Sequence, residues 1–136
     1  MEQEDKELLL KDLCARLLYD TFISVNGNIE TLIGLEYGES YIDDDTISKT
    51  PQFTTEGHGG RRFARDIEEI KPYLRPMSSM TEEEIIKYND ILHKHNELLG
   101  EHEASELIDW LISRHFDYRW LIEKGLAIEA PEGMYK

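Results

Sequence analysis

Hydrophobic and polar positions follow two different periods in the first part of the chain. In residues 5–18 leucines recur at helical spacing, which predicts an N-terminal helix with one apolar face. From Phe22 to Val25 the pattern changes to β-forming residues, and "NGN" at 26–28 is typical of a tight turn. A return strand is expected over residues 31–35. Gly38 would then turn the chain into a third strand at "ESYID", which gives a three-stranded antiparallel meander.

Residues 43–61 show no clear period. They contain three consecutive aspartates, one proline and three glycines, which predicts a mobile loop with at most a short strand at 52–55. Residues 62–65 are expected to form a last strand. The sequence "DIEEI" at 66–70 then predicts one helical turn.

The stretch "KPYLRPMSSM" contains two prolines, Pro72 and Pro76. A proline biases the residue before it toward an extended conformation, so Tyr73 and Leu74 are expected to be extended. A proline-rich peptide ligand would need an exposed segment. Here the apolar side chains between and after the prolines favour burial. We therefore interpret the stretch as a structural clasp between two parts of the fold.

Helical signals dominate the rest of the chain. Thr81 and Glu84 match the capping box, which predicts a helix that starts there and stops at Gly100. A further helix is expected over residues 103–115. Asp117 can cap a short last helix, and the remaining residues are expected to leave as an extended tail.

The order helix, meander, clasp, helices predicts an α+β fold. We expect a small antiparallel sheet, which could curl into an SH3-like barrel, packed against the N-terminal helix and the C-terminal helices. The 136 residues suit one domain in which residues 1–80 and residues 81–136 share one core.

Charge and composition restrict the function. The net charge is −14, and residues 1–80 and 81–136 each carry −7 (16 acids against 9 bases, and 13 against 6). Such a surface repels phosphate, so direct nucleic-acid binding is not expected. The longest apolar run is only Leu8 to Leu10, which predicts no membrane span. The acidic start "MEQEDKE" differs from an export signal, so we expect a cytoplasmic protein.

Residues that often carry chemistry lack the spacing that chemistry needs. His93 and His95 would point to different sides of a helix, and Gly100 separates them from His102. The metalloprotease pattern HExxH is absent from the sequence. Cys14, a lone thiol, is expected to be a small core residue. We predict no catalytic, cofactor-binding or metal-binding residues.

Two loop sequences have weak functional readings. "EGHGGRR" could form an anion-binding nest but lacks the phosphate-loop lysine, so a flexible hairpin tip is favoured. Asp43 to Asp45 could bind a hard cation but lack the EF-hand spacing, so a solvated loop is favoured.

Three long strings resemble segments of a group of small uncharacterised proteins encoded by gut Bacteroides-type bacteria and their prophages. They are "LLLKDLCARLLYD", "DIEEIKPYLRPMSSMTEEE" and "IDWLISRHFDYRWLIEKGLAIEAPEGMYK", and together they span over half of the chain. This chain has Leu18 where the group usually has proline, which would lengthen the first helix, and Trp120 where it usually has glycine. The resemblance implies a gene carried by a mobile element or prophage, and it implies no particular activity.

A non-enzymatic accessory or protein-interaction protein is therefore the leading hypothesis. The alternatives are an acidic inhibitor that acts as a nucleic-acid decoy for host machinery, and a small hydrolytic or metal-dependent enzyme. One helix face cannot bury both its Leu/Ile stripe and Trp110. Trp110, Tyr118 and Trp120 are therefore the candidate contacts for an unknown protein partner or for a second copy in a homodimer.

Overall fold

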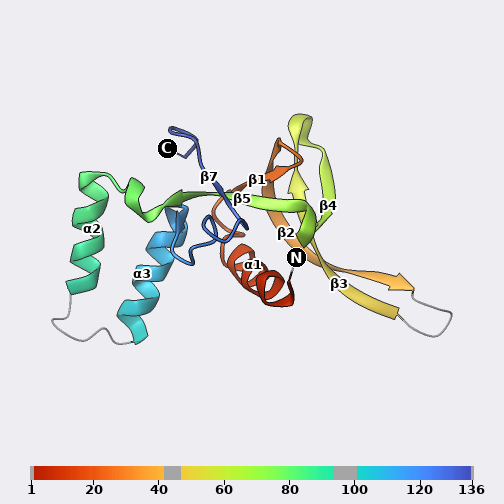
Figure 1. Cartoon of the computed structure of the whole chain (residues 1–136), viewed down its shortest axis with the longest axis horizontal. Coiled ribbons are helices and arrows are strands. Elements are labelled where there is room, and N and C mark those ends of the chain that lie inside the picture. Colours follow the sequence, from red (N-terminus) through yellow and green to blue (C-terminus); the bar gives the residue numbers. More distant parts are fainter. Residues whose placement is uncertain (1, 42–46, 94–100, 136) are drawn as a thin grey trace.

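A computed structural model describes residues 2–41, 47–93 and 101–135. It also describes their side chains, except those of residues 37–41, 47–50 and 101–104. The molecule is elongated, with two helices at one end and a long β-hairpin at the other (Figure 1). The N-terminal helix and one strand lie between these ends. The fold is α+β, as predicted.

The N-terminal helix α1 spans Gln3–Ala15 and buries Leu9 and Leu13 completely. The prediction of a helix is confirmed, but the expectation that Leu18 lengthens it is wrong. After Ala15 the chain turns away from the helix. Arg16 N–H donates to the Leu13 carbonyl, and Tyr19 N–H donates to the Arg16 carbonyl, each three residues back. Leu18 follows this turn and is 88% exposed.

Seven strands form one open sheet in the order β4-β3-β2-β1-β5-β6, with β7 also paired to β5. The strands are β1 Phe22–Val25, β2 Asn28–Tyr41, β3 Ile47–Glu56, β4 Arg62–Asp66, β5 Ile70–Pro76, β6 Phe116–Asp117 and β7 Ile128–Glu129. β4 and β6 lie at opposite ends and do not pair with each other, so the predicted SH3-like barrel is wrong. The sheet is also not purely antiparallel, because β6 and β7 run parallel to β5.

The meander is partly as predicted. Asn26 and Gly27 have φ values of 53° and 88°, as a tight two-residue hairpin turn requires, and β1 pairs with the expected return strand. The third strand at "ESYID" is wrong, because β2 continues through Gly38, which pairs with Thr50. A bulge between Leu32 and Gly34 is the irregularity in this ladder.

Most of the predicted loop over residues 43–61 is also wrong, because β3 occupies Ile47–Glu56. The short strand expected at 52–55 is the part of β3 that was predicted. A 3-10 turn η1, His58–Gly60, then leads into β4, with φ of 76° at Gly59. Asp43 to Asp45 lie outside the described residues.

The clasp is the strand β5, which pairs with β1 on one side and with β6 and β7 on the other. It follows the 3-10 turn η2, Ile67–Glu69, and precedes the 3-10 turn η3, Met77–Ser79. The predicted extended conformation of Tyr73 and Leu74 is confirmed. Leu74 is fully buried and Tyr73 is half-buried.

Helix α2, Glu82–His93, begins at the predicted capping box. Thr81 N–H donates to Glu84 Oε1 at 3.0 Å, and Glu84 N–H donates to Thr81 Oγ1 at 3.2 Å. Helix α3 spans Glu101–Ser113 and forms a hairpin with α2 (Figure 1). The predicted stop at Gly100 lies outside the described residues.

The predicted short last helix is wrong. Asp117 accepts hydrogen bonds from Leu121 N–H and Ile122 N–H, both at 2.9 Å, but the segment after it forms turns. The tail does not leave the molecule as expected. Ile128 and Glu129 pair with β5, and Tyr135 packs back against the sheet.

The main core joins α1, the strands and the C-terminal turns. Its members are Leu9, Leu13, Ile23, Val25, Leu32, Phe53, Ile67, Ile70, Leu74, Leu121, Leu126 and Ala127. Four further buried side chains, Ile91, Leu111, Ile112 and Phe116, lie outside this cluster and hold the helical hairpin. No helix in the described ranges is long and apolar enough to cross a membrane.

Candidate interaction surface

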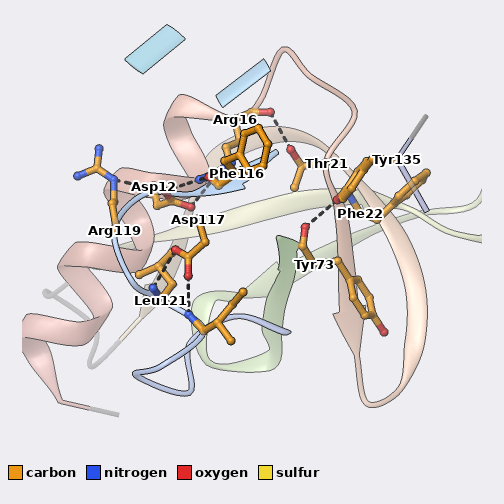
Figure 2. A network of polar contacts seen from close by, with 11 residues as sticks. Asp12, Arg16, Thr21, Phe22, Tyr73, Phe116, Asp117, Arg119, Leu121 and Tyr135 are labelled. Atoms are coloured by element: carbon orange, nitrogen blue, oxygen red, sulfur yellow. Dashed lines mark hydrogen bonds and ion pairs between the residues drawn. The ribbon is translucent and has the colours of Figure 1, made fainter. Parts of the chain in front are cut away.

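A buried charge network ties the C-terminal segment to α1 (Figure 2). Asp12 and Arg16 are both fully buried, and their side chains form a two-point contact of 2.7 Å and 3.2 Å. Arg16 Nη2 also donates to the Phe116 carbonyl at 2.7 Å, across 100 positions in sequence. Arg119 Nε lies 3.3 Å from Asp12 Oδ1. These contacts fix where the segment after α3 begins.

Tyr118, one of the three predicted contact residues, is packed into this network. Its ring lies 5.9 Å from the Arg16 guanidinium and 4.8 Å from that of Arg119. Its hydroxyl is buried and has no hydrogen-bond partner among the described residues. Tyr118 is therefore mainly a packing residue here.

Trp120 is placed differently, with 56% of its surface exposed. Its backbone has φ 62°, in the left-handed region that costs a non-glycine residue about 1–2 kcal/mol. A glycine at this position would adopt this φ without strain. The two residues after Trp120, Leu121 and Ile122, donate their N–H groups to the Asp117 carboxylate, and these hydrogen bonds hold the turn in place.

Trp110 is half-buried on α3, with its ring 5.9 Å from that of Phe116. Leu111 and Ile112 of the predicted apolar stripe are buried, whereas Ile108 is 40% exposed. The structure therefore does not join the three aromatic residues into one cluster. Trp110 contacts Phe116, Tyr118 contacts arginines, and Trp120 lies at the surface.

Trp110 also lines a groove of about 960 Å³, whose walls are β5 with η3, the start of α2, the end of α3 and the C-terminal tail. Its charged side chains have both signs. Lys87 and Arg114 line it together with Glu83 and Glu132, and the surface also contains prolines and Tyr135. No described histidine lines it.

Arg75 and Glu84 form an ion pair in the wall of this groove. Arg75 Nη1 is 2.8 Å from Glu84 Oε2, and Arg75 Nη2 is 2.6 Å from Oε1. This bond holds the pKa of Glu84 at about 2, well below its usual value. The Arg75 guanidinium also stacks on the Phe116 ring at 4.3 Å, so a single side chain joins β5, α2 and β6.

The tail wall of the groove is anchored by Tyr135. Its ring is stacked between Phe22 and His115, with centroid distances of 5.3 Å and 3.7 Å. Its hydroxyl accepts a hydrogen bond from Phe22 N–H at 2.9 Å and donates to the Tyr73 carbonyl at 2.8 Å. The β1–β5 ladder ends with the pair Ile23 and Pro72, and Phe22 and Tyr73 are the next residues beyond it. The Tyr135 hydroxyl therefore bridges the two strands one position past their last pair (Figure 2).

Burial changes both titratable groups of this stack. It raises the pKa of Tyr135 to about 12. It also lowers the pKa of His115 to about 4, with help from the positive charges of Arg16 and Arg75. His115 is therefore neutral at pH 7 and packs as an uncharged ring.

Other sequence candidates are scattered. His58 lies exposed in η1 and His93 exposed at the end of α2, whereas the side chains of His95 and His102 are outside the described set. Among the described residues, no three potential ligands gather as a metal site. Cys14 is exposed, so its predicted core position is wrong, because it lies around the helix from Leu9 and Leu13. The "HGG" sequence forms the tight connection between β3 and β4.

Sequence reasoning missed the groove and the residues that define it. Arg75 and Glu84 are nine positions apart, and only the three-dimensional path of β5 and α2 makes them partners. For the position of Tyr135 the sequence offered one local signal, Gly133, whose φ of 81° marks a turn just before it. No family model, curated protein or solved structure matches the chain, so the groove itself has to support any functional conclusion.

Proposed function

We propose that this chain is a non-enzymatic accessory protein that acts by binding another protein, and that its groove receives a peptide segment of that partner. The groove between the helical hairpin and the C-terminal tail is the observation that carries the proposal. The placement in a mobile element or prophage rests on the resemblance of the three sequence strings.

The chemistry of the groove suits a peptide. Trp110 and an arginine, Arg114, are residue types that dominate binding energy at protein interfaces. Lys87 and Glu132 offer charges of both signs, so a peptide with mixed charge can be matched. The tight Arg75–Glu84 pair holds the wall in place before a partner arrives, which reduces the ordering cost of binding. Trp120 stays a predicted additional contact.

The acidic-decoy alternative would have to use acids other than the four that act inside the fold. Asp12 and Glu84 neutralise arginines, Asp117 holds a turn, and Glu30 binds Arg65 and Thr55. These carboxylates are not available as a phosphate-like surface. Three of these acids and their arginine partners cancel in the net charge of −14, so that charge is carried by the other residues of the chain.

The proposal is tested by capture from cells of the encoding organism with matched variants. The groove variant Lys87→Glu/Arg114→Glu reverses two charges, and the control Lys11→Glu/Lys124→Glu makes the same charge change on exposed residues elsewhere. We expect quantitative mass spectrometry to find a protein that wild type and control retain and that the groove variant loses at least tenfold. Equal capture by all three proteins would contradict a binding role for the groove.

A further inference from the structure

β4 is an edge strand on the side of the molecule opposite the helical hairpin (Figure 1). It has five residues, "RFARD", of which only Arg65 is not exposed. Within the described ranges, no strand pairs with its outer edge. An unpaired edge presents N–H and C=O groups that can template another strand, so proteins usually protect it.

The outward groups of this edge follow from the hydrogen-bond alternation of antiparallel strands. Gly57 N–H donates to the Arg61 carbonyl at 2.8 Å, which makes this a hydrogen-bonded pair of the β3–β4 hairpin. Such pairs recur at every second residue, so Phe63 and Arg65 also bond to β3. The N–H and C=O groups of Arg62, Ala64 and Asp66 therefore point away from the sheet.

The sequence of this edge is complementary to itself in the antiparallel direction. If two copies of β4 pair about Ala64, each Arg62 lies opposite Asp66 of the other copy, and each Phe63 lies opposite Arg65. The same register aligns the outward groups of Arg62, Ala64 and Asp66 with those of the second copy. We propose that β4 is a homodimerisation edge, at which two copies of this chain join their sheets through antiparallel β4–β4 pairing.

Opposite charges select this register over its neighbours. A shift by two residues in one direction leaves Asp66 without its arginine and places Phe63 against Phe63. A shift in the other direction places Arg65 against Arg65, and like charges directly opposite destabilise a sheet. A protective edge would need only charges that repel a second copy, whereas this edge places opposite signs at equal distances from Ala64.

Two exposed side chains of β4, Arg62 and Phe63, are available for these contacts. Arg62 is 70% exposed, and its Nε is 3.8 Å from the nearest Glu56 oxygen, so its present ion pair is weak. Phe63 is 36% exposed beneath the Arg65 guanidinium, at 4.4 Å, and pairing would cover it with Arg65 of the second copy.

One backbone group is already used. Asp66 N–H donates to Glu69 Oε1 at 3.1 Å, and the Asp66 side chain accepts from the Glu69 backbone in a capping box. The dimer would thus form four backbone hydrogen bonds rather than six: two between the Ala64 residues and two from Arg62 N–H groups. The Asp66 carboxylate has lone pairs left to accept from arginine. Because a five-residue edge is short, the association should be weak.

Charge variants test the register. Arg62→Asp opposes two aspartates in a homodimer, and Asp66→Lys opposes lysine and arginine, so each variant alone should sediment as a monomer. Mixed in equal amounts, the two variants regain both opposite-charge pairs and should form a heterodimer. The control Lys124→Asp changes net charge as Arg62→Asp does, at an exposed position. It should associate like wild type at concentrations up to about 1 mM.

A second variant keeps the test independent of side-chain effects on folding. Ala64→Pro removes the central outward N–H, which an edge strand tolerates, so circular dichroism should be unchanged while association is lost. A wild-type protein that stays monomeric at the highest concentration overturns the proposal. So does a dimer that survives Ala64→Pro, or a mixture of the two charge variants that does not associate.

Discussion

Two regions of the molecule bury their residues to different extents: the body, which is α1 with the sheet, and the helical hairpin of α2 and α3. In the body, α1 and the turn after it contribute four fully buried side chains, Leu9, Asp12, Leu13 and Arg16, and β5 contributes Ile70 and Leu74. In α2, Ile91 is the buried residue, while Ile85 and Ile86 are 45% and 61% exposed. The body therefore has its own closed core, whereas α2 buries only Ile91, near the end of the helix that is farther from β5.

The difference shows which contacts join the two regions. Arg75 reaches from β5 to Glu84 of α2 and to the Phe116 ring, and its N–H donates to the His115 carbonyl at 2.8 Å. Phe116 is in turn bonded to Arg16 of the body. Two arginines thus meet at Phe116, Arg75 at its ring and Arg16 at its carbonyl, and connect the hairpin to the core. Arg75 also lines the groove. Variants that disrupt the contacts of each arginine separately therefore test the comparison between the body and the hairpin.

The largest effect is expected from Asp12→Asn in the body. It leaves Arg16 buried with its charge uncompensated, which typically costs about 3–5 kcal/mol. Chemical denaturation should show this loss as a lower midpoint for the whole protein, because Arg16 also holds Phe116. The matched control is Glu4→Gln, the same chemical change at an exposed position of α1, which should alter stability by less than about 0.5 kcal/mol. Equal stability of the two variants would show that the buried pair is not a main support of the core.

Truncation of the clasp should have the next largest effect. Leu74→Ala removes a fully buried side chain from β5 and should destabilise the protein by about 2–4 kcal/mol. Ile86→Ala makes a comparable truncation on the exposed face of α2 and should change the unfolding free energy by less than about 0.5 kcal/mol. If the two variants lose similar stability, the hairpin is packed as tightly as the body and the comparison fails.

Features with local causes were predictable from the sequence. The "NGN" turn needs only two residues with positive φ, and the capping box needs only Thr81 and Glu84. Both occur where they were expected, because neighbours in sequence satisfy them. The Asp117 cap was predicted for the same reason, but the helix behind it did not form, since the following N–H groups bond within turns.

Features with distant causes were not predictable. Gly38 and Pro51 looked like turn and loop signals, yet pairing along β2 and β3 overrides both. The tail was expected to leave the molecule, but its pairing with β5 and the stack on Tyr135 depend on residues about 60 to 110 positions away. The candidate site was the least predictable feature, because it depends most on contacts between residues distant in sequence. Its groove is built from three separate stretches of sequence, 75–87, 110–114 and 129–135, and of the three predicted contact residues only Trp110 lines it.

The smallest effect is expected from Glu84→Gln at the base of the hairpin. It removes the charge that Arg75 binds but keeps an amide that can still accept, so we expect a loss of about 1–2 kcal/mol. Because this bond ties α2 to β5, hydrogen exchange should quicken in α2 and α3 and stay unchanged in β1 and β2. A uniform change across the protein would mean that the hairpin and the body unfold as one unit.

The pH dependence of this variant gives a second readout. The pKa of Glu84 is about 2 in the folded protein and about 4.5 ordinarily, so the unfolded chain takes up its proton first as the pH falls. The stabilisation is therefore complete above about pH 4.5 and is lost between pH 4.5 and pH 2. Glu84→Gln should remove this part of the acid destabilisation, so that its stability curve approaches that of wild type as the pH falls to 2. Two parallel curves over this range would show that the Arg75–Glu84 bond does not couple the hairpin to the body.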